Sequence, residues 1–126
     1  MSQQAESKFK QILEYAATAA VNARSERVDR TQISKLMEVF ESRPSREGIE
    51  ILKMFILRQV QRGEIKSRTA KTLIEALSKI DDPQLVREFL TYFRWIFEAL
   101  EKCGPNLPRS TKYEDVIHHI VSVCLR

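Results

Sequence analysis

Basic side chains gather in the middle of this 126-residue chain, and binding of phosphate groups is the chemistry that such a cluster could perform. Eight lysines and arginines lie between residues 43 and 71 against three glutamates. That segment therefore carries a net charge of +5, whereas the whole chain carries +4. A nucleic-acid backbone favours concentrated positive charge because each neutralised phosphate releases condensed counterions.

Arg58 and Arg62 are the centre of this candidate binding surface, because residues four apart lie on the same face of a helix. Lys66 and Arg68 follow shortly after Gly63 and could extend the surface, and Lys53 precedes it on the same predicted helix. The alternative is that these charges only solvate a helix face and pair with nearby glutamates.

A second candidate surface is aromatic. In the segment from residue 83 to 102, counting 100° per residue places Trp95 opposite the main apolar stripe, with Tyr92 beside it. Aromatic side chains are enriched at protein interfaces and also stack on unpaired bases. Tyr92 and Trp95 are therefore predicted interface residues; the alternative is that the first or last helix covers them.

The remaining reactive side chains indicate no catalytic or metal site. His118 and His119 are adjacent, which points them about 100° apart on a helix. Cys103 and Cys124 stand 21 positions apart and show no zinc-binding spacing. With no glycine-rich phosphate loop and no G-x-S-x-G motif, we expect no enzyme, no metal and no cofactor. Two cysteines are too few for a disulfide framework, so we expect reduced thiols and a cytoplasmic location.

The composition predicts an all-α fold. Hydrophobic residues make up 43% and charged residues 30% of the chain, and only three glycines and four prolines are available for turns. This length and composition predict one soluble domain over residues 1–126, with no signal peptide and no membrane span. The apolar periodicity predicts a compact bundle of about six helices. Their expected ranges are 5–24, 30–42, 45–62, 67–80, 83–102 and 111–123.

Two details of this bundle can be predicted from side-chain types. The third helix has bulky apolar residues in nearly every direction around its axis, which predicts that it lies at the centre of the bundle. Capping boxes are predicted at Asp29 with Gln32 and at Thr111 with Glu114, and Gly63 is the expected end of the third helix. Asp82 before Pro83 is a further start signal.

Three stretches together resemble a known family. Residues 31–40 (TQISKLMEVF), 51–62 (ILKMFILRQVQR) and 89–100 (FLTYFRWIFEAL) are similar to the small helical subunit of the type III-A CRISPR effector, the second subunit of the Csm complex. The resemblance covers residues 30–102, and Ser34 stands where the family often has arginine. The matching positions are Gln32, Lys35, Lys53, Arg62, Phe89, Phe93 and Glu98.

This resemblance implies a non-catalytic subunit of an RNA-guided complex. Such subunits stack beside other effector subunits and line the path of the guide and target RNA with basic side chains. We therefore expect Lys35 to join the basic residues named above as an RNA-binding position. The alternative is a helical protein-interaction module or homodimer with no nucleic-acid role, whose working surface includes Tyr92 and Trp95.

Overall fold

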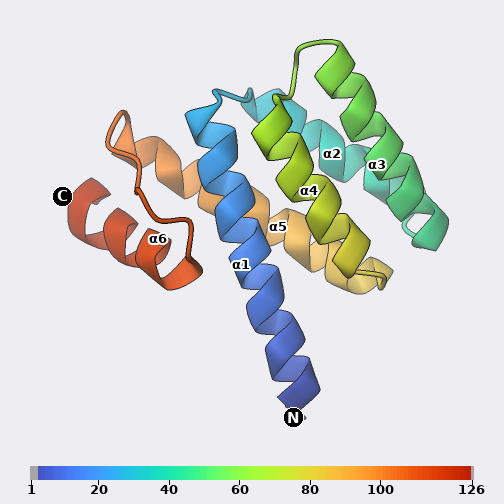
Figure 1. The fold of residues 1–126 in the computed structure, drawn as a ribbon, viewed down its shortest axis with the longest axis horizontal. Coiled ribbons are helices and arrows are strands. Elements are labelled where there is room, and N and C mark those ends of the chain that lie inside the picture. The colour runs from blue at the N-terminus through green and yellow to red at the C-terminus, as the bar shows by residue number, and fades with distance from the viewer. Residues whose placement is uncertain (1–2, 126) are drawn as a thin grey trace.

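The computed structural model describes residues 3–125, and these form helices joined by short loops with no strand among them (Figure 1). The predicted all-α bundle is thus confirmed. The helices are α1 (Gln3–Ser25), α2 (Arg30–Ser42), α3 (Arg46–Gln61), α4 (Ser67–Lys79), α5 (Pro83–Ala99) and α6 (Tyr113–His119). A short 3-10 helix, η1 (Leu100–Cys103), continues α5, and a π-helical turn, η2 (Ile120–Cys124), continues α6.

Helix α1 is the centre of the bundle. It lies between α4 and α6 and crosses α5, with which it shares its largest contact (Figure 1). Asn22 Nδ2 donates to Thr72 Oγ1 of α4 at 2.9 Å, and Glu14 Oε1 accepts from the backbone N–H of Tyr113 at 2.9 Å at the start of α6. The prediction that α3 is central is wrong, because α3 packs mainly on α2 and α4 and leaves one side open to solvent.

One hydrophobic core joins all six helices, and aromatic rings of α5 fill its middle. Phe89, Phe93 and Phe97 follow one another along the buried face of α5, with neighbouring ring centroids 6.2 and 6.4 Å apart. Opposite them, α1 presents small side chains, and this lets the two backbones approach closely. The buried alanines of α1 are Ala16, Ala17, Ala19, Ala20 and Ala23.

The helix ends confirm some of the predicted capping signals and contradict others. Asp82 accepts a hydrogen bond from the Gln84 N–H at 2.8 Å with Pro83 in the first turn, and Gly63 follows α3 at φ 77°, as expected. Asp29 caps α2 by accepting from the Thr31 N–H at 3.0 Å, but the side chain of Gln32 is buried and does not complete a capping box. The box expected at Thr111 is also wrong, because Glu14 of α1 caps α6 instead.

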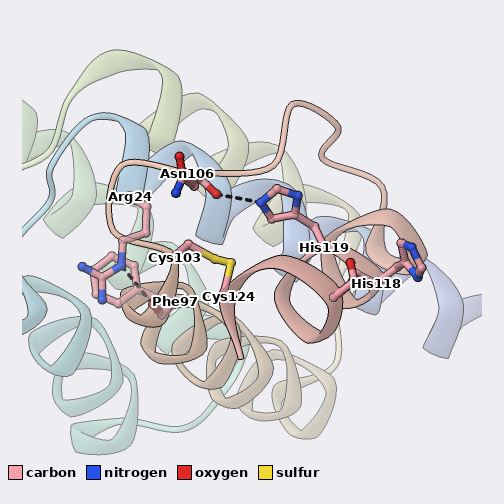
Figure 2. The surroundings of a disulfide bond; sticks show 8 residues. Arg24, Phe97, Cys103, Asn106, His118, His119 and Cys124 are labelled. Atoms are coloured by element: carbon pink, nitrogen blue, oxygen red, sulfur yellow. Dashed lines mark hydrogen bonds between the residues drawn. A yellow bond between two sulfur atoms is a disulfide. The ribbon is translucent and has the colours of Figure 1, made fainter. Parts of the chain in front are cut away.

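The ends of α1 and α5 are held together by Arg24 (Figure 2). Its guanidinium carbon lies 4.0 Å from the ring centroid of Phe97, and its Nε donates to the Phe97 carbonyl oxygen at 3.0 Å. Nη2 lies 2.9 Å from Glu101 Oε1, an ion pair without hydrogen-bond geometry. These contacts place the charge of Arg24 inside the fold rather than on a binding surface.

Candidate functional site

Four exposed cations lie where α3 ends and α4 begins, and we call Arg58, Arg62, Lys66 and Arg68 the basic corner. Arg58 and Arg62 are one turn apart at the end of α3, and Lys66 and Arg68 flank the start of α4. No residue in the described part of the chain forms an ion pair with any of the four. The side chains are therefore available to an external anion.

Buried contacts beneath the basic corner fix its backbone. The carbonyl of Gln59 accepts from the N–H groups of Glu64 and Ile65 at 2.9 and 3.3 Å, which closes the turn after α3. Ile65 is buried and anchors the turn in the core. Thr69, in the first turn of α4, is fully buried and donates hydrogen bonds to Glu26, the residue that follows α1. The spacing between the basic residues is thus set by the fold rather than by a flexible loop.

The carboxylate of Glu26 caps the N-terminus of α4. Glu26 Oε1 accepts from the Thr69 N–H and the Thr69 hydroxyl, both at 2.7 Å. Burial by itself would raise the pKa of Glu26, but the hydrogen bonds from Thr69 and Arg68 and the charge of Arg68 together lower it. Glu26 is therefore an anion that offsets part of the charge of Arg68 at one edge of the corner.

Two other predicted RNA-binding residues lie outside the basic corner. Lys53 Nζ is 3.0 Å from Glu50 Oε2 on α3, and its side chain is only 22% exposed, so the structure does not group it with Arg58. Lys35 is exposed on α2, three residues after Gln32, which contacts Gln59 at the end of α3. Lys35 thus faces solvent on the helix that packs against the one carrying the arginines.

Two large apolar side chains beside the arginines were missed in the sequence analysis. Met54 and Leu57 of α3 are 62% and 57% exposed. Met54 precedes Arg58 by four residues, a spacing that places the two on one helix face. That spacing was readable in the sequence, but the expectation of a central third helix assigned both residues to the core. The exposed face of α3 is therefore part cationic and part apolar.

The aromatic residues of α5 border an open apolar hollow of about 390 Å³ between α1, α5 and α6. Trp95 is 61% exposed at its rim, and the Tyr92 ring lies between those of Trp95 and Phe9, with centroids 6.0 and 6.1 Å away. Burial raises the pKa of Tyr92, and the charge and hydrogen bond of Glu88 raise it further. The lining side chains are Phe9, Leu13, Tyr92, Trp95, Ile96, Ala99, Tyr113, Ile117 and Ile120.

The expectation of two reduced thiols is wrong in this structure, because Cys103 and Cys124 form a disulfide (Figure 2). Their Cα atoms are 4.6 Å apart because residues 104–112 return the chain so that η2 packs on η1. His119 lies beside this disulfide with Nε2 2.6 Å from the carbonyl oxygen of Asn106, while His118 points away from it (Figure 2). A 21-residue separation gave no sign of this contact.

The described helices include none with the length and hydropathy to cross a lipid bilayer. Comparisons of this chain with protein-family models, with curated proteins and with solved structures find no match.

Proposed function

We propose that this chain is a non-catalytic small subunit of a type III CRISPR effector complex, and that its basic corner binds the backbone of the guide and target RNA. The resemblance described above supplies the biological context. The observation that supports RNA binding is the group of four exposed cations at the junction of α3 and α4, which form no ion pair with any residue that the structure describes.

Three arginines of α2 and α5 provide a contrast. Arg30 lies 3.1 Å from Glu101, Arg87 2.7 Å from Glu41 and Arg94 3.7 Å from Glu98, so each already has a carboxylate partner. An RNA phosphate would have to compete with these partners. At the basic corner it meets cations that form no ion pair among the described residues, which makes that region the favoured place for a phosphate.

The proposed recognition is electrostatic and independent of base identity. Each phosphate neutralised lowers the logarithm of the binding constant by about 0.7 to 0.9 per tenfold rise in salt. Four contacts therefore predict a slope of about −2.8 to −3.6. Lys35 would add a fifth contact if the RNA crosses from α3 onto α2, whereas Lys53 contributes little while Glu50 neutralises it.

Charge reversal at the corner tests this function. Arg58→Glu with Arg62→Glu should weaken binding of a labelled guide–target RNA duplex, measured by fluorescence anisotropy at low salt, by at least roughly tenfold. Lys8→Glu with Lys10→Glu is the matched control, because it changes the net charge equally at exposed residues near the other end of α1. Equal loss in both double variants, or no loss in the first, would contradict the assignment.

The CRISPR context has its own test. Co-expression with the backbone subunit of a type III effector and a guide RNA should retain this protein in the purified complex, and retention should weaken when Arg58 and Arg62 are both reversed. A protein that binds RNA but never enters such a complex would keep the RNA-binding role and exclude the CRISPR one.

A helical protein-interaction module is the second candidate, and the exposed Trp95 above the apolar hollow supports it. If this surface mediates self-association, light scattering should show a dimer that persists at high salt, and Trp95→Ala should convert it to monomer. Met54→Ala is the control, because Met54 is equally exposed on a different helix. A monomeric wild-type protein would exclude the homodimer.

A further inference from the structure

The two cysteines and His119 form a cluster whose chemistry is not used by either proposed function. One ring nitrogen of His119 and the Sγ atoms of Cys103 and Cys124 all lie within 4.8 Å of one another. They come from three elements, η1, α6 and η2, that the fold brings together at one corner (Figure 2). Two thiolates and an imidazole are soft and borderline donors, the set that zinc prefers in proteins.

We propose that Cys103, Cys124 and His119 form a redox-controlled zinc site, closed as a disulfide under oxidising conditions and able to bind Zn²⁺ when reduced. Reduction by two equivalents of a monothiol adds two electrons to the sulfur–sulfur bond. Two protons complete the Cys103 and Cys124 thiols, and the reductant leaves as its own disulfide. Zinc then binds the thiolates and releases those two protons.

The distances fit this role after a small movement. In a tetrahedral site with Zn–S near 2.3 Å and Zn–N near 2.0 Å, two sulfurs lie about 3.8 Å apart and a sulfur and nitrogen about 3.5 Å apart. The His119 nitrogen lies within 4.8 Å of both sulfurs, so it needs to approach them by no more than about 1.3 Å. The Cα atoms of the cysteines, 4.6 Å apart, allow the two sulfurs to separate without a new fold.

Room for the metal and its fourth ligand is present beside His119. A surface hollow of about 600 Å³ is bordered by Asn106, Arg109, His119 and Val123, so His119 is the member of the cluster that lines it. Three protein ligands leave one tetrahedral position for water or an external donor. Cys103 is buried while Cys124 and His119 are half-buried, so the cluster is held by the core at Cys103 and borders the hollow at His119.

The hydrogen bond from His119 to Asn106 limits how the imidazole can bind a metal when the disulfide is reduced. A carbonyl oxygen only accepts, so Nε2 carries the ring proton while it donates to Asn106 at 2.6 Å. Metal binding needs an imidazole lone pair. Either Nε2 gives up this hydrogen bond, or Nδ1 binds the metal and the bond to Asn106 becomes the outer contact that orients the ring. In the second case the hydrogen bond from Nε2 to Asn106 is the same in the disulfide form and in the metal form.

Titration of the whole protein with Zn²⁺ in a phosphine reductant, against a chromophoric chelator, tests the site. We expect one equivalent of Zn²⁺ to bind the reduced protein and none to bind the oxidised protein. Co²⁺ in place of zinc should give a thiolate-to-metal charge-transfer band in the near ultraviolet. His119→Gln, which keeps an N–H donor for Asn106, should weaken Zn²⁺ binding by at least roughly tenfold.

His118→Gln is the matched control, because it changes the adjacent exposed histidine and should leave Zn²⁺ binding unchanged. The double variant Cys103→Ser with Cys124→Ser should lose both the Zn²⁺ binding and the charge-transfer band, with far-ultraviolet circular dichroism confirming that each variant is folded. Equal binding by the oxidised and reduced proteins would overturn the proposal. So would wild-type affinity in folded His119→Gln, or no binding by the reduced protein.

Discussion

Gln59 donates a hydrogen bond from Nε2 to Oε1 of Gln32 at 2.6 Å, across the buried interface of α3 and α2. Both side chains are almost fully buried, and Gln32 Nε2 lies 3.4 Å from Glu64 Oε2. The Oε1 atom of Gln59 is buried without a partner among the described residues. This polar contact joins the two helices at Gln59, the residue that follows Arg58 near the end of α3.

The glutamine pair predicts a non-additive effect on stability. Gln32→Leu alone should lower the free energy of unfolding by about 1–3 kcal/mol, because it leaves Gln59 Nε2 buried without an acceptor. The double variant Gln32→Leu with Gln59→Leu should lower the free energy of unfolding by less than the sum of the decreases in the two single variants. Urea unfolding of all four proteins measures the coupling, and strict additivity would show that the hydrogen bond contributes no specific stability.

Glu26 predicts a dependence of stability on pH. Its pKa is below the ordinary value of 4.5 in the folded protein, where Thr69 and Arg68 donate to the carboxylate. The stabilisation is therefore fully present above pH 4.5 and is lost as the pH falls through the folded-state pKa. Glu26→Gln should cost about 1 kcal/mol near pH 7, as for loss of a helix cap, and less once the pH has fallen through the folded-state pKa.

Glu38→Gln is the control for this measurement, since Glu38 is exposed on α2 and its carboxylate forms no hydrogen bond or ion pair with the described residues. Urea unfolding at several pH values compares the two variants with the wild type. A cost of Glu26→Gln that does not change with pH would mean that the carboxylate charge is not what stabilises the start of α4.

Two aromatic residues of α5 should respond very differently to truncation. Phe93 is fully buried between Phe89 and Phe97, so Phe93→Ala should lower the free energy of unfolding by about 3–5 kcal/mol. Trp95 lies two residues later and is 61% exposed, so Trp95→Ala should lower the free energy of unfolding by less than about 1 kcal/mol. Thermal unfolding distinguishes them, and a large loss for Trp95→Ala would mean that Trp95 supports the fold rather than a partner surface.

The disulfide should contribute to stability through the loop that it closes. Cys103 and Cys124 are separated by 21 residues, a loop for which chain entropy gives about 3 kcal/mol. Reduction in the presence of a chelator should therefore lower the free energy of unfolding by about that amount, measured in urea with and without reductant. Equal stability of both forms would show that non-covalent contacts hold this segment without the disulfide.

The helices were predictable from the sequence because their signals are local. Apolar periodicity, Asp82 before Pro83 and Gly63 after α3 act within a few residues, and the structure agrees at each. The outward position of Trp95 also followed from counting residues around α5. These features depend on the helix itself and not on its neighbours.

The errors concern features decided by distant parts of the chain. Gln32 was expected to complete the capping box of α2, but its side chain accepts a hydrogen bond from Gln59 instead. Thr111 was expected to cap α6, but Glu14 accepts from the Tyr113 N–H at the start of that helix. Bulky apolar residues around α3 suggested a central helix, yet Met54 and Leu57 are exposed. The contact of Cys103 with Cys124 depends on the path of residues 104–112, which no local pattern specified.

The alanines of α1 restrict how this protein can vary. Ala16, Ala17 and Ala19 point in different directions around the helix and are all fully buried, so α1 has neighbours on several sides at short range. A residue even one methylene larger meets packed atoms there, and such overpacking typically costs 1–3 kcal/mol. A library of single substitutions should therefore find the middle of α1 the least permissive region of the chain, although its side chains are the smallest.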